Sequence, residues 1–166
     1  KIKINFSDTF AFDNEFYFTL KNDKKINVLS IGKEANFLSK IYNKKEFNFT
    51  QSSIKSTNYN NISKQQLIIL NEIENISEIM SKKIIEFSKN GGNLVIIPNE
   101  NANVNSYNSL LKLLNAGKIQ PKKIDTLKVT SINFSHPLFK NVFSNKVTNF
   151  QYPTIKSYFP NPSKNA

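Results

Sequence analysis

Residues 66–99 carry, without interruption, the patterns of a β-strand, a capped α-helix, a glycine pair and a second β-strand. The apolar runs at 67–70 and 94–97 are short, continuous and rich in branched side chains, which is typical of strands buried on both faces of a parallel sheet. Two parallel strands need a crossover connection, which is most often a helix. The stretch therefore predicts a βαβ unit and restricts the chain to folds that contain a parallel sheet.

The segment between the two runs has the features of a helix. Asn75 and Glu78 have the N-cap and N3 spacing of a capping box. Gly91 can adopt the left-handed conformation that ends a helix. Apolar residues at helical spacing predict one face that packs on the sheet, and these residues are Ile76, Met80, Ile84 and Phe87.

The chain before this unit predicts a hairpin, then a strand, a helix and another strand. Residues 1–20 alternate apolar and polar side chains around a polar turn, so they form a hairpin or a pair of edge strands. A strand at 26–31 ends at Gly32, and an edge strand is expected at 47–50. The helix between these strands is expected to bury one face, made of Phe37, Leu38, Ile41 and Tyr42.

The chain after the unit continues the alternation. The asparagine-rich loop 99–105 opens another helix, which Gly117 is expected to end. A strand follows at 126–132, and residues 138–143 form a strand or a short helical turn. The buried face of the helix is expected to comprise Tyr107, Leu110, Leu111 and Leu114.

Strands that alternate with helices across short loops predict an α/β fold of three layers. We expect a mostly parallel, flavodoxin-like sheet with helices on both faces, and an amino-terminal β hairpin or extra edge strands. Residues 22–150 would form the α/β domain, 1–21 strands at its edge or the end of a preceding β domain, and 151–166 an extended tail. Because Lys1 starts directly in a strand pattern, we interpret the chain as a piece of a longer protein.

The basic side chains are all lysines, although the formal net charge is +11. Arginine supplies the bidentate contacts to guanine and phosphate that readers of nucleic acid commonly use. The lysines are also scattered along the chain and do not form one dense stripe. We therefore expect a solvated cationic surface that can steer acidic partners, and no nucleic-acid partner.

The sequence contains no cysteine, which excludes disulfides, thiolate metal sites and a cysteine nucleophile. No apolar run is long enough to cross a membrane. Attachment to a membrane would therefore depend on segments outside this chain.

Polar residues follow three of the expected parallel strands, where such sheets bind ligands at the point of strand-order reversal. Glu72 and Glu100 could form a carboxylate pair or a site for a hard cation, but loops also carry acids for solubility. We assign no metal or cofactor. The candidate ligand-binding residues are Gly32, Asn71, Glu72, Asn99 and Glu100.

Catalytic groups are not evident. The corner at 97–100 lacks the serine or cysteine of a nucleophile elbow. His136, the single histidine, could act as a base, a metal ligand or a pH switch, but each role requires positioned partners. A turn residue held by hydrogen bonds is the alternative for His136. We therefore assign no catalytic residue.

Six segments span nearly the whole chain in a fixed order: IKINFSDTFAFDNEFYFTL, INVLSIG, QLIILNEIENIS, FSKNGGNLVIIPN, INFSHPLFKNVF and NFQYP. Together they resemble the carboxyl-terminal extracytoplasmic region of BatA-type membrane proteins of Bacteroidetes, which carry an aerotolerance-regulator amino-terminal domain. The resemblance implies a class I glutamine amidotransferase-like fold for residues 22–150. It also implies a membrane anchor near the amino terminus of the full-length protein, often with a degenerate von Willebrand A-like segment, and places this region on the periplasmic face.

The sequence departs from the enzymes of that fold. True amidotransferases place a cysteine at the elbow, which falls here near Pro98 and Asn99, and use a histidine with an acid later in the chain. His136 has no acidic partner in the pattern of the family. The resemblance therefore implies a scaffold without the catalytic site.

An α/β skeleton without a nucleophile leads to the hypothesis of a non-catalytic protein-interaction domain in a membrane-anchored cell-envelope protein. The resemblance implies partners among other Bat-type or von Willebrand A-containing envelope proteins, with an associated MoxR-type ATPase system. The alternative is a small-molecule or glycan-binding domain, or a divergent hydrolase, that uses the crevice at the strand ends.

Overall fold

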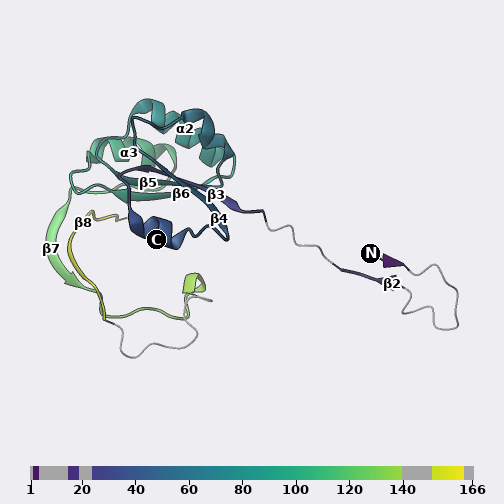
Figure 1. The fold of residues 1–166 in the computed structure, drawn as a ribbon. Coiled ribbons are helices and arrows are strands. Elements are labelled where there is room, and N and C mark those ends of the chain that lie inside the picture. Colours follow the sequence, from purple (N-terminus) through teal and green to yellow (C-terminus); the bar gives the residue numbers. More distant parts are fainter. Residues whose placement is uncertain (1, 4–14, 19–23, 140–150, 163–166) are drawn as a thin grey trace.

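The central sheet has four parallel strands (Figure 1). A computed structural model describes residues 2–3, 15–18, 24–139 and 151–162. Across the sheet the order is β4, β3, β5, β6, with bounds β3 (Ile26–Gly32), β4 (Phe47–Ser52), β5 (Leu67–Ile73) and β6 (Asn93–Pro98). β4, the next strand in the chain, pairs with one edge of β3, and β5 pairs with the opposite edge, so strand order reverses between β3 and β5. The α/β prediction is confirmed, and the order is consistent with a flavodoxin-like arrangement.

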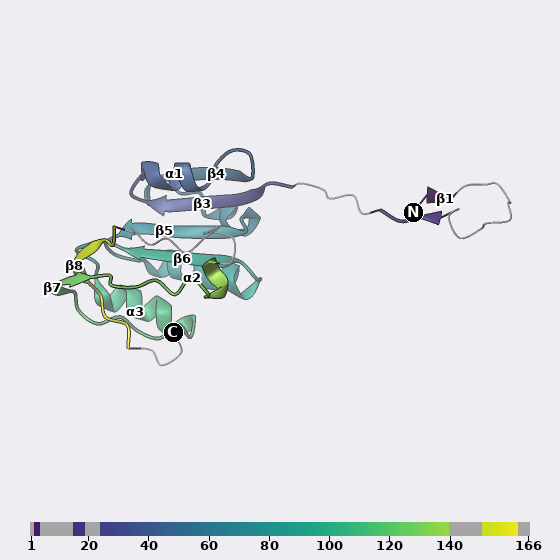
Figure 2. The same cartoon turned by 90° about the horizontal axis from the view of Figure 1, so that it is seen from below.

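Helices cover both faces of this sheet, as the alternation predicts (Figures 1 and 2). α2 (Glu78–Lys89) and α3 (Val104–Leu113) lie on one face, where α2 contributes Met80 and Ile84 to the core. α1 (Asn36–Ile41) lies on the other face and packs Leu38 on Val28 and Ile69. Alternate residues of the central strands therefore enter two separate cores.

The two central strands, β3 and β5, are buried on both faces. Val28 and Ile31 of β3 and Ile68, Ile69 and Leu70 of β5 are all 0% exposed. Burying one such branched side chain contributes roughly 1.5–3 kcal/mol, so this pair of strands dominates the stability of the sheet. The predicted apolar face of α2 is confirmed for Met80, Ile84 and Phe87, which are buried on the helix, while the fourth residue, Ile76, is buried just before the helix starts.

The prediction that 94–97 is buried on both faces is wrong. β6 is the edge of the four-stranded sheet, and Val95 is 40% exposed. Leu94 and Ile96 pack against the core under α2 and α3, whereas α1 lies over the opposite half of the sheet (Figure 2). A continuous apolar run thus occurs in a strand of which one face is only partly covered.

The buried face predicted for the first helix is also wrong in part. Within α1 only Leu38 is buried, while Phe37 and Ile41 are 49% and 59% exposed. A helix of six residues is less than two turns long, so few of its side chains can reach the sheet. Tyr42 follows α1 and stacks on Phe49 with ring centroids 5.5 Å apart.

The capping box predicted at Asn75 is wrong, because Ser77 is the N-cap of α2. The backbone N–H of Met80 donates to Ser77 Oγ at 3.2 Å. β5 extends to Ile73, three residues beyond the predicted run, and the buried Ile76 then passes over the core before the helix starts. Gly91 ends α2 with φ of +85°, as predicted.

α3 begins near the predicted position but ends earlier. Tyr107 and Leu110 are buried, whereas Leu111 and Leu114 are only half-buried. The helix stops at Leu113, and Asn115 supplies a left-handed residue with φ of +54° before Gly117 is reached. Asparagine tolerates this conformation better than most side chains, so the stop needed no glycine.

Two antiparallel hairpins accompany the sheet. β1 (Ile2–Lys3) pairs with β2 (Glu15–Phe16), as the predicted hairpin requires, and they form a sheet of their own. β7 (Lys123–Lys128) pairs with β8 (Thr154–Tyr158). The strand predicted at 126–132 thus starts three residues earlier and ends at Lys128, while β8 lies in the range predicted as an extended tail.

Two short 3₁₀ helices complete the described elements, namely η2 (Tyr59–Lys64) and η3 (Pro137–Phe139). η3 falls in the segment predicted as a strand or a helical turn, and residues 140–143 of that segment lie outside the described residues. Among the described helices, none combines the length and the apolar character that a membrane span requires.

Replacing Ser77 with alanine tests the position of the α2 cap. Ser77→Ala removes the acceptor for the Met80 N–H and should lower the free energy of unfolding by about 1 kcal/mol. Asn75→Ala is the matched control and should change it by only a few tenths, because the Asn75 side chain makes no hydrogen bond among the described residues. Urea unfolding followed by circular dichroism measures both. A larger loss of unfolding free energy in Asn75→Ala than in Ser77→Ala would indicate that Asn75 is the N-cap, as the sequence predicts.

Candidate functional site

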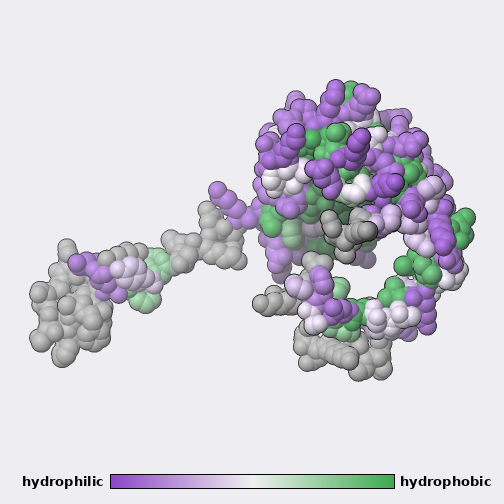
Figure 3. Space-filling view, turned by 180° about the vertical axis from the view of Figure 1, so that it is seen from behind, coloured by the Kyte–Doolittle hydropathy of each residue, from purple (hydrophilic) through white to green (hydrophobic). Residues whose placement is uncertain are grey.

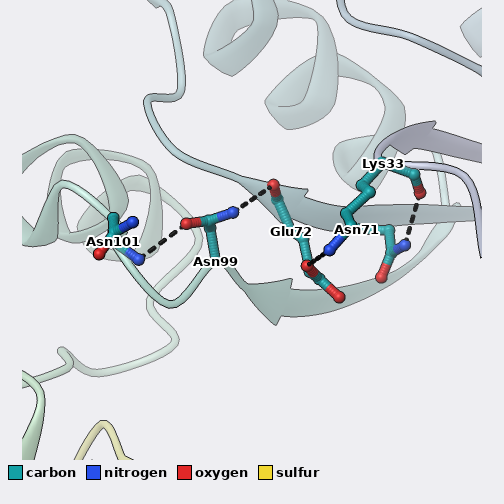
Figure 4. A network of polar contacts seen from close by, with 5 residues as sticks. All are labelled: Lys33, Asn71, Glu72, Asn99 and Asn101. Atoms are coloured by element: carbon teal, nitrogen blue, oxygen red, sulfur yellow. Dashed lines mark hydrogen bonds and ion pairs between the residues drawn. The ribbon is translucent and has the colours of Figure 1, made fainter.

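The carboxyl ends of β3, β5 and β6 bring together four of the five residues that the sequence marks as a candidate site, and Glu100 lies outside this group. Figure 4 shows Lys33, Asn71, Glu72 and Asn99 within one network of polar contacts. The network lies where strand order reverses, between β3 and β5. Open α/β sheets bind their ligands at this point because the loops there diverge and leave a crevice.

Gly32 and Asn71 hold the ends of the two central strands together. Gly32 has φ of +125°, and a Cβ atom on it would lie 2.1 Å from the carbonyl oxygen of Asn71. The Lys33 N–H donates to that carbonyl at 2.9 Å, and Asn71 Nδ2 donates to the Lys33 carbonyl at 2.7 Å. Only glycine fits this close approach, so Gly32 sets the geometry of the site.

Asn71 is fully buried, and one of its polar atoms is unsatisfied. Its Nδ2 bonds to Lys33, but its Oδ1 has no hydrogen-bond partner within the part of the chain that the structure describes. Leaving a buried acceptor unpaired costs roughly 1–3 kcal/mol. A water or ligand donor at this position would remove that penalty.

Glu72 has an unusual backbone conformation at the same point. Its φ is +51°, and the register between β5 and β6 shifts between Asn71 and Ile73. Left-handed conformations of residues other than glycine occur often at functional sites. The bulge turns the Glu72 side chain toward Lys33, whose Nζ lies 2.9 Å from Glu72 Oε2.

The ion pair between Lys33 and Glu72 is open to solvent. The hydrogen bond to Glu72, and after it the charge of Glu72, raise the pKa of Lys33, and the charge of Glu100 adds in the same direction. The Lys33 side chain is 68% exposed, so water and salt screen the pair and its contribution to stability is small. It presents one positive and one negative group side by side at the rim of the site.

The Asn99 side chain fastens the loop after β6 to the end of β5. Its Nδ2 donates to the Glu72 carbonyl at 3.1 Å, and its Oδ1 accepts the Asn101 N–H at 2.7 Å (Figure 4). Both functions of the amide are therefore used within the protein. The structure assigns Asn99 a positioning role in the loop.

Glu72 and Glu100 do not share one cation-binding arrangement. Glu100 Oε1 lies 3.4 Å from Lys122 Nζ, whereas Glu72 forms its ion pair with Lys33. In the described ranges, no three His, Cys, Asp or Glu residues come close enough to hold a metal ion. Each carboxylate thus has its own lysine partner.

Sequence reasoning missed Lys33 and Tyr107. Tyr107 lies on α3, is 1% exposed, and donates its hydroxyl hydrogen to the Ile73 carbonyl at the end of β5. Burial raises the pKa of Tyr107, and a backbone hydrogen bond with Asn99 acts in the opposite direction. Helical spacing predicted Tyr107 only as a core residue, and no pattern in the sequence indicates its hydrogen bond.

His136 lies on the surface in a chain of turns. The backbone N–H of His136 donates to the Asn133 carbonyl at 3.1 Å, and the His136 carbonyl accepts the backbone N–H of Phe139 at 2.8 Å. The imidazole and the Phe139 ring meet edge to face with centroids 6.3 Å apart. These bonds agree with the interpretation of His136 as a turn residue.

The candidate site is thus a bonded cluster with one buried acceptor and one exposed ion pair. Comparison with protein-family models, with curated proteins and with solved structures yields no match to this chain.

The close contact of Gly32 predicts a strong effect of a single methyl group. Gly32→Ala must relieve both the positive φ and the overlap with the Asn71 carbonyl, so it should lower the free energy of unfolding by about 3 kcal/mol. Gly91→Ala is the matched control, because Gly91 also has positive φ but its Cβ would meet nothing within 4 Å. It should lose only about 1 kcal/mol. Equal losses of unfolding free energy in the two variants, measured by urea unfolding, would contradict the close contact between Gly32 and the Asn71 carbonyl.

Proposed function

We propose that the chain is a non-catalytic protein-interaction domain of a membrane-anchored cell-envelope protein of the BatA type, with a class I glutamine amidotransferase-like fold and a periplasmic location. The six-segment resemblance supports the family, the fold and the location. The four-stranded parallel sheet with helices on both faces supports the α/β core that such a fold requires. One structural feature, the β7–β8 hairpin, carries the interaction role.

The hairpin projects from the α/β core as an arm (Figures 1 and 2). Every residue of β7 is exposed, so neither face of this strand is buried in the core. Cross-strand register shows how its side chains divide: Leu127 lies opposite Ile155, and Lys128 opposite Thr154. Opposed residues of an antiparallel pair point to the same face.

One face of the arm is apolar and the other is basic. The apolar face carries Ile124, Leu127 and Ile155, which are 82%, 41% and 39% exposed. The other face carries lysines, at 123, 128 and 156. Figure 3 shows hydrophobic side chains beside hydrophilic ones on this arm. Such a surface suits a partner that combines apolar and acidic groups.

The base of the arm is fixed to the core, so the arm has a defined direction. Ile119 is 8% exposed and belongs to the main core cluster, against which Phe159 also packs. The Gln120 N–H donates to the Pro160 carbonyl at 2.8 Å, which closes the base of the hairpin. A two-stranded ribbon with an apolar face gains little stability alone, but it can add strands or side chains to a partner.

The resemblance names the partners that we propose. They are other Bat-type or von Willebrand A-containing envelope proteins, with a MoxR-type ATPase system acting across the membrane. The net charge of +11 supports an acidic partner surface, because long-range attraction speeds encounter with it.

A second candidate function is the binding of a small molecule at the strand-end cluster. The specific observation in its favour is the buried, unpaired Oδ1 of Asn71 beside the left-handed Glu72. Titration of the ¹⁵N-labelled chain with oligosaccharides, followed by NMR, tests it: saturable shifts at Lys33, Asn71 and Glu72 would support this candidate.

The interaction role predicts that the apolar face of the arm is required for capture of a partner. The immobilised chain should retain a defined protein from a detergent extract of the cell envelope. The double variant Ile124→Thr/Ile155→Thr should weaken that retention at least tenfold. Both changes remove exposed apolar area but keep β-branched side chains, so the strands should still form. Ile79→Thr, at a 65% exposed position of α2, is the control and should retain the protein like the wild type. Reproducible failure to retain any protein, or equal retention by all three chains, would overturn the proposal.

A further inference from the structure

A second polar surface lies at the amino ends of the strands, at the opposite end of the sheet from the cluster in Figure 4. Two cavities of about 140 Å³ and about 250 Å³ adjoin there, between η2, the last turn of α2 and the start of β6. They share Ser63, Phe87 and Asn90, so they form one groove, here called the amide groove. We propose that the amide groove binds a neutral carbohydrate.

The electrostatics of the groove favour a neutral ligand. Its two charged lining residues, Lys83 and Glu86, pair with each other at 3.2 Å and so cancel locally. The C-terminal end of α2, with its negative end of the helix dipole, also lies at the groove and disfavours anions. A chain with a net charge of +11 thus presents a groove without excess positive charge.

The amide side chains in the groove keep unused hydrogen-bonding groups. Asn60 and Asn90 have no side-chain hydrogen bond to any described residue. Gln66 Oε1 accepts the Asn27 N–H at 2.8 Å, which leaves its Nε2, and Gln65 Nε2 donates to the Asn61 carbonyl at 2.9 Å, which leaves its Oε1. The groove therefore offers both donors and acceptors.

Asparagines elsewhere in the described chain either bond within the protein or, like Asn75, line neither cavity of the groove. Asn71 and Asn99 use side-chain amide groups to hold strand ends, and Asn108 uses both of its functions on the backbone of Ile119. Neighbouring hydroxyls of a sugar each donate and accept, so an amide with a free N–H and a free oxygen matches them well.

An apolar floor complements the amides. The Phe87 ring is 4% exposed and lies beneath Gly92, where a Cβ atom would come within 2.3 Å of the ring. Tyr59 is half-buried and packs on the main core cluster at the other end of the groove. Gly91 and Gly92 leave the rim open because neither has a side chain. Because the Phe87 ring is almost fully covered, the C–H face of a sugar ring would lie on Tyr59 and on the backbone of the two glycines while its hydroxyls meet the amides.

The test is a titration of the ¹⁵N-labelled full chain with maltotriose, cellotriose and tri-N-acetylchitotriose, followed by heteronuclear NMR. We expect saturable shifts at Gly91, Gly92 and the side-chain amides of Asn60 and Asn90 with at least one of these sugars. Asn60→Ala/Asn90→Ala should weaken the binding at least tenfold, because each change removes one hydrogen-bonding side chain. Both positions are exposed, so the spectrum of the variant should otherwise match that of the wild type.

Asn105→Ala is the matched control, because Asn105 is exposed on α3 and does not line the groove. It should bind the sugar like the wild type. The proposal is overturned if none of the three sugars gives saturable shifts, if the shifts cluster at Lys33 and Asn71, or if the double variant binds unchanged. It is also overturned if inorganic phosphate binds the groove more tightly than the sugars do.

Discussion

The parallel pairing of β3 and β5 is the constraint on which the rest of the structure depends. Both strands are buried on both faces, so their backbone groups must pair with each other and with β4 and β6. Where this pairing ends, Gly32 lets the chain approach the Asn71 carbonyl more closely than any other residue would. The loops that leave the two ends of the sheet begin from positions that this pair fixes.

The two ends of the sheet differ in how they use their polar side chains. At the carboxyl end, Asn71 and Asn99 bond within the protein and tie one strand end to the next, which leaves Asn71 Oδ1 as the unsatisfied atom. At the amino end, the side chains of Asn60 and Asn90 make no hydrogen bond to a described residue and line a groove. The β7–β8 arm adds a third kind of surface, apolar on one face and basic on the other, so the proposed contact surfaces lie apart from the bonded strand ends.

Sequence patterns predicted those features that depend on local periodicity. These features are the βαβ unit, the buried face of α2 and the end of α2 at Gly91, all of which are set by the local pattern of apolar residues and glycines. Features that depend on tertiary contacts were not predicted. β6 is an edge strand because no further strand pairs with it among the described residues. Ser77, and not Asn75, caps α2 because β5 continues to Ile73 and the helix starts later. Four of the five candidate residues converge, namely Gly32, Asn71, Glu72 and Asn99, whereas Glu100 pairs with Lys122 outside the network. The lysine partners of Glu72 and Glu100 were not predictable, since the fold places Lys33 and Lys122.

Native-state hydrogen exchange tests most directly whether one buried strand pair supports a separate, exposed arm. The account predicts that the slowest amides belong to the centres of β3 and β5 and exchange only through global unfolding, because the central residues of these strands are fully buried. Amides of β7 and β8 should exchange through much cheaper local opening, since every residue of β7 is exposed. Protection in the arm equal to that in β5 would contradict the account, because the arm would then be part of the same cooperative core.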